Sequence, residues 1–95
     1  MHSILAVDDW ASMRQRVTLT LKNAGFNGVE AVGGQDAIET GNSRDFNPVL
    51  TDQDLPHIDG ISLTRKLRKN PKFKSTPILI LTSAARQPGA LPWAT

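Results

Sequence analysis

The chain contains no cysteine and few aromatic residues, which make up 5% of its 95 residues. Without cysteine, neither a disulfide framework nor a thiolate metal site can form. No apolar run approaches the roughly 20 residues that a membrane-spanning helix needs, and the chain opens on a strand pattern with no signal peptide before it. These absences predict a cytoplasmic protein without a membrane segment.

The chain also carries little net charge, +2 at pH 7, which is too small to predict a nucleic-acid partner by itself. Hydrophobic residues make up 39% and charged residues 21%, which is ordinary for a folded globular protein. A length of 95 residues leaves room for one small domain.

Three short apolar runs are each followed by side chains that carry oxygen. They are Ile4-Leu5-Ala6-Val7 before Asp8-Asp9, Val49-Leu50-Thr51 before Asp52, and Ile78-Leu79-Ile80-Leu81 before Thr82-Ser83. Runs of this length, bounded by turn residues such as Pro56, are typical of buried strands. The sequence therefore predicts three buried strands that end in polar groups.

Helical patterns and a weaker strand separate these runs. We predict a helix from Ala11 to Ala24, a strand over 26–32, a helix over 35–40 that ends at Gly41, a loop over 43–48, a helix over 61–70, a link over 71–76 and a last strand over 77–81. Strands that alternate with helices predict an α/β domain with a parallel sheet covered on both faces. The domain spans residues 1–83, and residues 84–95 are predicted to be an irregular tail.

The predicted topology brings distant acidic residues together. If the chain of a doubly wound sheet runs outward from the first strand to the second and then returns to the third, the first and third strands are neighbours, about 4.8 Å apart, and Asp8, Asp9 and Asp52 would share one crevice. Like charges this close repel one another unless a cation lies between them, and an all-oxygen ligand set favours Mg²⁺. A carboxylate beside such an ion can attack phosphorus. We predict Asp52 as the nucleophile, Asp8 and Asp9 as metal ligands, and Thr82 as a hydroxyl donor to the phosphoryl group.

The segments ILAVDDWASMRQ, VLTDQDLPHIDGISL and PILILTS resemble the three signature regions of response-regulator receiver domains, and most of all those of single-domain chemotaxis regulators. The resemblance covers residues 1–83 and implies a flavodoxin-like sheet in the order 2-1-3-4. It implies roles for seven residues: Asp8 and Asp9 as the acidic pair, Asp52 as phosphoacceptor and metal ligand, Asp54 as a metal ligand through its backbone carbonyl, Pro56 and Gly60 in the loop, and Thr82 as the switch hydroxyl.

The resemblance also implies partners and a type of activity. Receiver domains use Mg²⁺, take their phosphoryl group from a sensor histidine kinase and then bind a downstream protein, so we predict a signalling domain that is not an enzyme. No direct nucleic-acid or membrane partner is expected. The family continues through a fourth helix, a fifth strand that ends in a lysine, and a fifth helix. Because this chain has no lysine after Lys74, we expect a truncated domain whose phosphorylation is slow.

Other interpretations stay open at this point. Asp8 and Asp9 are suitable caps for the helix that follows them, and a threonine such as Thr82 is common in turns. A second hypothesis is an interaction protein that forms a homodimer through an unpaired edge of its last strand. An aspartate-nucleophile phosphatase ranks last, because that chemistry places an acid two residues after the nucleophile on the first strand, where this chain has Trp10.

Overall fold

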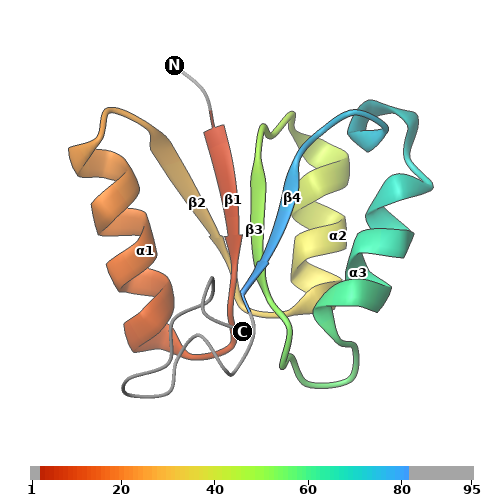
Figure 1. Ribbon diagram of the computed structural model, residues 1–95, viewed down its shortest axis with the longest axis horizontal. Helices are drawn as coiled ribbons and strands as arrows, with labels where there is room; N and C mark the ends of the chain where they lie inside the picture. The colour runs from red at the N-terminus through yellow and green to blue at the C-terminus, as the bar shows by residue number, and fades with distance from the viewer. Residues whose placement is uncertain (1–2, 82–95) are drawn as a thin grey trace, which may run out of the picture.

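Four parallel strands form one sheet in the order β2-β1-β3-β4 in the computed structural model, which describes residues 3–81 (Figure 1). The strands are β1 (Ser3–Val7), β2 (Asn27–Ala31), β3 (Val49–Asp52) and β4 (Ile78–Leu81). Val7 of β1 lies opposite Ala31 of β2 and Thr51 of β3. The predicted order of the strands is confirmed, and the register brings the ends of β1 and β3 level with each other.

Helices cover both faces of this sheet (Figure 1). Helix α1 (Ala11–Asn23) lies on one face, mainly against β2, and helices α2 (Gly34–Ser43) and α3 (Gly60–Arg68) lie on the other. A short 3-10 helix, η1 (Pro71–Phe73), leads from α3 to β4. Among the helices of residues 3–81, none combines the length and the apolar character that crossing a membrane requires.

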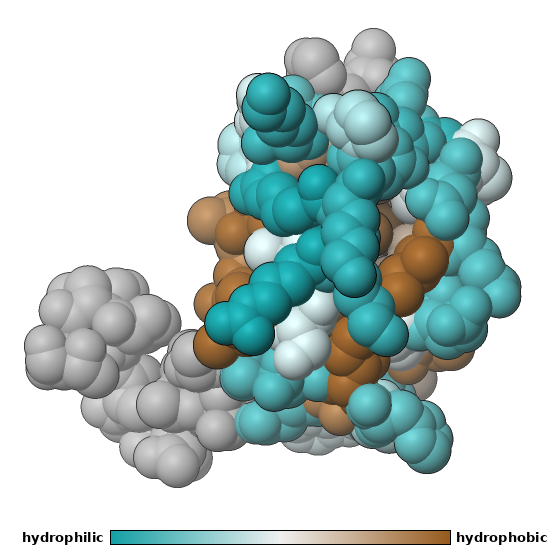
Figure 2. Space-filling view, turned by 90° about the vertical axis from the view of Figure 1, so that its right-hand side faces the viewer, coloured by the Kyte–Doolittle hydropathy of each residue, from teal (hydrophilic) through white to brown (hydrophobic). Residues whose placement is uncertain are grey.

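The hydrophobic core lies between the sheet and the pair of helices α2 and α3. It is built from alternate strand residues, which point to one face, and from the inward sides of the helices. Its largest fully buried members are Leu5, Val49, Leu63 and Phe73. On the outer side of α3, hydrophilic side chains cover most of the surface, with apolar strips between them (Figure 2).

Helix α2 continues further than the sequence predicts. It passes through Gly41 and ends at Ser43, although the prediction ended it at Gly41. Gly41 is buried, and a Cβ atom placed there would lie 3.2 Å from the ring of Phe73. This glycine therefore provides close packing between α2 and η1, and the prediction that it stops the helix was wrong.

Helix α1 is less buried than its apolar stripe predicts. Met13, Val17 and Leu21 are only half-buried, and none of the 13 residues of α1 is fully buried within the part of the chain that the structure describes. Leu79 and Leu81 of β4 are exposed at 53% and 37%. The face of the sheet that carries α1 therefore holds apolar side chains that residues 3–81 cover incompletely.

Candidate functional site

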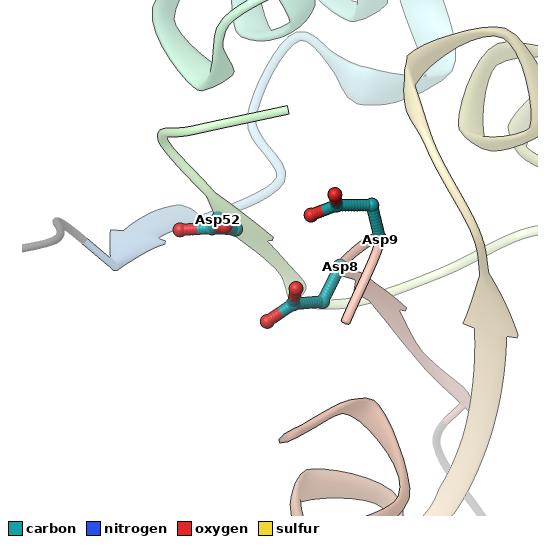
Figure 3. A group of neighbouring side chains, drawn as sticks. All are labelled: Asp8, Asp9 and Asp52. Atoms are coloured by element: carbon teal, nitrogen blue, oxygen red, sulfur yellow. The ribbon is translucent and has the colours of Figure 1, made fainter. Parts of the chain in front are cut away.

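The ends of β1 and β3 bring three aspartates together, as Figure 3 shows. Asp8 and Asp9 follow β1, and Asp52 is the last residue of β3. Each of the three offers one carboxylate oxygen, and these oxygens all lie within 4.8 Å of one another. The side chains of Asp8 and Asp9 leave the end of β1, and in this view that of Asp9 points toward Asp52. The predicted convergence of these residues is therefore confirmed, although Asp52 lies 43 positions after Asp9 in the sequence.

Burial differs among the three carboxylates. Asp52 is 1% exposed and Asp8 is 5% exposed, whereas Asp9 is open to solvent. Moving a carboxylate out of water is unfavourable unless nearby charges or hydrogen bonds compensate it. Two buried carboxylates beside a third form an arrangement that a cation would stabilise.

Hydrogen bonds fix the backbone around Asp8. Its N–H donates to the carbonyl of Ala31 on β2 at 3.1 Å, and its carboxylate oxygen Oδ1 accepts from the N–H of Trp10 at 2.9 Å. Trp10, not an aspartate, occupies the N-cap position of α1, and its side chain makes no capping hydrogen bond. The interpretation of Asp8 and Asp9 as helix caps was therefore wrong, because both residues precede the cap position.

Arg14 also holds Asp8, a role that the sequence prediction did not include. Its guanidinium nitrogen Nη1 donates to the backbone carbonyl of Asp8 at 2.7 Å, and its Nε donates to a carboxylate oxygen of Glu30 on β2 at 2.9 Å. One side chain of α1 thus joins the end of β1 to β2. The signal that could have indicated this role was an arginine in the first turn of the helix that follows the acidic pair.

A tight connection links Asp52 to the start of α3. The N–H of Gly60 donates to the carbonyl of Gln53 at 3.0 Å, and the side-chain oxygen of Gln53 accepts from the N–H of Ile61 at 3.1 Å. A Cβ atom on Gly60 would lie 2.8 Å from the carbonyl oxygen of Asp52. Glycine at position 60 is therefore required for this close approach, which supports the importance predicted for it.

Asp59 caps α3, a role that the sequence prediction did not include. Its carboxylate accepts from the N–H of Ser62 at 2.7 Å, which is the geometry expected of an N-cap residue. The hydrogen bonds from Ser62 lower the pKa of the Asp59 carboxyl below its ordinary value. An aspartate directly before a helical pattern is the signal that could have identified it.

The remaining predicted residues are Asp54, Pro56 and Thr82. Asp54 is exposed in the loop after β3, and Pro56 belongs to the same loop. The role of the Asp54 carbonyl as a metal ligand stays a prediction. Thr82 and the tail over 84–95 lie outside the described residues.

The three aspartates suit a hard divalent cation. All the ligand atoms are carboxylate oxygens from neighbouring strand ends, and their spacing allows one ion to contact all of them. Mg²⁺ is usually held by one or two carboxylates together with water and a phosphate group. The residues present therefore fit Mg²⁺ by number, type and spacing.

A family model described as the response regulator receiver domain matches residues 4–91 of the chain. The chain belongs to this family. As a receiver domain, it shares the sheet order and the acidic strand ends described above with proteins of two-component signalling.

Curated relatives of this receiver domain are chemotaxis proteins. The chain is 36% identical over 85 residues to chemotaxis protein CheY-3 of Vibrio cholerae, an alignment that covers 88% of this chain and 65% of that relative. It is 35% identical over 85 residues to chemotaxis protein CheY of Pseudomonas aeruginosa, of which it covers 68%. The chain thus spans about two thirds of the length of the curated relatives that it matches.

Solved structures of receiver domains superpose closely on the chain. CheY4 of Vibrio cholerae matches with a TM-score of 0.82 at 34% identity, covering 84% of this chain and 67% of that one. The response regulator TrrA of Thermotoga maritima, solved in complex with Mg²⁺ and BeF, matches with a TM-score of 0.82 at 29% identity, covering 90% and 73%. Receiver domains bind Mg²⁺ at an acidic pocket, and in this chain Asp8, Asp9 and Asp52 lie close together at the ends of β1 and β3.

Proposed function

We propose that this receiver domain accepts a phosphoryl group on Asp52, with Mg²⁺ held by Asp8, Asp9 and Asp52, and that phosphorylation changes which partner it binds. The observation that carries the proposal is the approach of the three carboxylates to within 4.8 Å at the ends of β1 and β3. The backbone carbonyl of Asp54 is proposed as a further ligand, and Thr82 as the hydroxyl that contacts the phosphoryl group.

The proposed reaction transfers a phosphoryl group from a phosphohistidine of a sensor kinase. A carboxylate oxygen of Asp52 attacks phosphorus and forms a new O–P bond, while the N–P bond breaks and its electron pair stays on the histidine nitrogen. Asp52 suits this role because it ends the central strand β3, whose backbone is fixed by β1 and β4 on either side. When bound, Mg²⁺ would neutralise charge on the transferred group.

Two other residues hold the ends of the site in place. Gln53 donates its N–H to the carbonyl of Leu81 at 2.8 Å and so keeps the chain after Asp52 against β4. Gly60 lets the start of α3 approach the Asp52 carbonyl. Because these contacts join the phosphoacceptor to β4 and α3, a phosphoryl group on Asp52 would act directly on the segments beside it.

The test is to add Mg²⁺ and acetyl phosphate to the purified chain and to measure its intact mass, with binding of beryllofluoride as a second measurement. We expect the mass increase of one phosphoryl group in the wild type, dependent on Mg²⁺, and no increase in Asp52→Asn. The matched control is Asp54→Asn, which removes the same charge two residues away and keeps its backbone carbonyl.

Two outcomes would contradict the proposal. Equal modification of the wild type and Asp52→Asn would place the phosphoryl group elsewhere. The second outcome is a wild type that neither gains mass nor binds beryllofluoride in Mg²⁺, although it and Asp54→Asn show the same spectrum of a folded protein. This result would exclude phosphorylation and leave the family assignment intact.

A second candidate function is self-association through β4, with a second copy of this chain as the partner. The observation that favours it is the exposure of Leu79 and Leu81, at 53% and 37%, on a strand that pairs only with β3 within residues 3–81. All four residues of β4 are apolar, so its edge lacks the charges that usually prevent edge-to-edge pairing.

Sedimentation over a wide range of protein concentration tests this second function. Self-association predicts a dimer in the wild type and a monomer in Leu79→Lys, while Leu19→Lys on α1, at a leucine of similar exposure, should leave the dimer intact. A wild type that remains a monomer at the highest concentration would exclude it.

A further inference from the structure

Arg14 is placed to control the geometry of the acidic group from the side of α1. Its guanidinium donates to the Asp8 carbonyl at 2.7 Å through Nη1 and to Glu30 at 2.9 Å through Nε, and its side chain is 13% exposed. These two bonds leave in different directions from one planar group, so they fix both its position and its orientation. The backbone that carries the Asp8 carboxylate is therefore tied to β2 as well as to α1.

We infer that Arg14 is a positioning residue for the cation site, holding the Asp8 and Asp9 segment in the conformation that binds Mg²⁺. Partners of metal ligands that do not touch the metal orient those ligands, and removing them typically weakens metal binding by about 10- to 100-fold. This inference rests on the proposed function, because it concerns the same cation. It adds a role for a residue of α1 that contacts neither the phosphoryl group nor the metal in the proposed mechanism.

Whether replacing Arg14 weakens or strengthens Mg²⁺ binding distinguishes a positioning role from a purely electrostatic one. Arg14 is a cation near an acidic group, so its charge alone opposes the binding of another cation. If charge were its only contribution, Arg14→Met would bind Mg²⁺ more tightly than the wild type. If Arg14 positions Asp8, the same variant binds Mg²⁺ more weakly, and Arg14→Lys does too, because a lysine keeps the charge and loses the planar two-bond geometry.

The experiment is a Mg²⁺ titration followed by tryptophan fluorescence in a Trp93→Phe background, which leaves Trp10 beside the site as the sole tryptophan. We expect the dissociation constant to rise about tenfold in Arg14→Met and in Arg14→Lys. The matched control is Arg16→Met, which removes the same charge from an exposed position of α1 and should change the constant by less than about twofold.

A second measurement covers the case in which Arg14→Met folds poorly. Amide NMR spectra of metal-free Glu30→Gln, which alters only the far partner of Arg14, should shift the signals of Asp8, Asp9 and Trp10 while the signals of α3 stay in place. Urea unfolding of every variant separates lost affinity from lost stability.

The outcomes distinguish the inference from the proposed function. Tighter binding in Arg14→Met, or wild-type binding in Arg14→Lys, overturns the positioning role and leaves the cation site standing. Unchanged amide signals in Glu30→Gln also count against it. A wild type that does not bind Mg²⁺ overturns the proposed function itself, and the positioning role with it.

Discussion

Two buried regions of this receiver domain oppose each other in their effect on stability. Under α2 and α3, the residues Leu5, Leu63 and Phe73 fill an apolar interior, and burial of such side chains stabilises the fold. At the ends of β1 and β3, Asp8 and Asp52 are almost as deeply buried, yet they bring like charges together beside Asp9. The first region explains why the chain folds, and the second is the site of the proposed Mg²⁺ binding.

The contrast is sharpest within β3 itself. Val49 and Thr51 are fully buried and help to hold the sheet, and Asp52 follows directly at 1% exposure. One strand thus supplies both packing and a charged site, because its carboxyl end is the point where the sheet stops and loops begin. Substitutions in the two regions should therefore change stability and Mg²⁺ binding independently.

The largest effect on stability is expected for Phe73→Ala. The ring of Phe73 is 1% exposed and packs against Gly41, so its loss leaves a cavity and should reduce the free energy of unfolding by about 3–5 kcal/mol. The Mg²⁺ dissociation constant of the folded fraction should be unchanged. Phe26→Ala, at a ring that is 39% exposed, is the matched control with a much smaller expected loss.

The next largest effect on stability should come from the binding of Mg²⁺, and Asp9→Asn should abolish this stabilisation. At about 100 times its dissociation constant, a ligand that binds only the folded state adds about 2.7 kcal/mol to the free energy of unfolding. In the absence of Mg²⁺, Asp9→Asn should be at least as stable as the wild type, because one of three neighbouring charges is gone. Urea unfolding with and without Mg²⁺ measures the stability of the wild type and of Asp9→Asn. Equal stabilisation of the two proteins by Mg²⁺ would contradict a cation site that includes Asp9.

Gly60→Ala tests whether the two regions are joined. The added Cβ would lie 2.8 Å from the Asp52 carbonyl and 3.0 Å from the side-chain oxygen of Gln53, so we expect a loss of about 1–3 kcal/mol. Because the displaced atoms belong to the site, Mg²⁺ affinity should fall as well, which Phe73→Ala should not cause. Thermal unfolding measures the loss of stability, and a Mg²⁺ titration measures the loss of affinity. Normal Mg²⁺ affinity in Gly60→Ala would show that the packing at Gly60 does not affect the cation site.

The smallest effect is expected at Asp59, the exposed N-cap residue of α3. The hydrogen bonds from Ser62 lower the pKa of this carboxyl in the folded protein, so its contribution is present above the unfolded value of 3.8 and disappears as the pH falls through the folded value. Asp59→Asn should therefore be slightly less stable than the wild type at neutral pH, and the difference should shrink below about pH 4. Urea midpoints at a series of pH values measure this, and a constant difference would contradict it.

The sequence predicted the parts of this structure that depend on local pattern. The strands and their polar ends followed from apolar runs that stop at acidic residues, and the resemblance to receiver domains implied the strand order that brings Asp9 to Asp52. It did not predict that α2 passes through Gly41, because the partner that requires a glycine there is Phe73, which is distant in sequence. The role of Arg14 was missed for a similar reason, since one of its partners is a backbone carbonyl that carries no mark in the sequence.

The degree of burial was the least predictable property. The apolar stripe of α1 indicates an inward face, and Val17 and Leu21 do turn toward the sheet beside Leu50. They remain half-buried because cover on this face depends on neighbours that a helical period does not specify. On the other face, α2 and α3 pack against each other as well as against the sheet, and Leu63 and Leu67 are fully enclosed.

The most direct test of the cation site is paramagnetic line broadening by Mn²⁺, which takes the same oxygen ligands as Mg²⁺. We predict that small additions of Mn²⁺ broaden the amide signals of Asp8, Asp9 and Asp52 together and first, and that excess Mg²⁺ restores them. Broadening that begins at other carboxylates, such as Glu39 or Asp45, or that affects the end of β1 without the end of β3, would contradict a single site shared by the two strands.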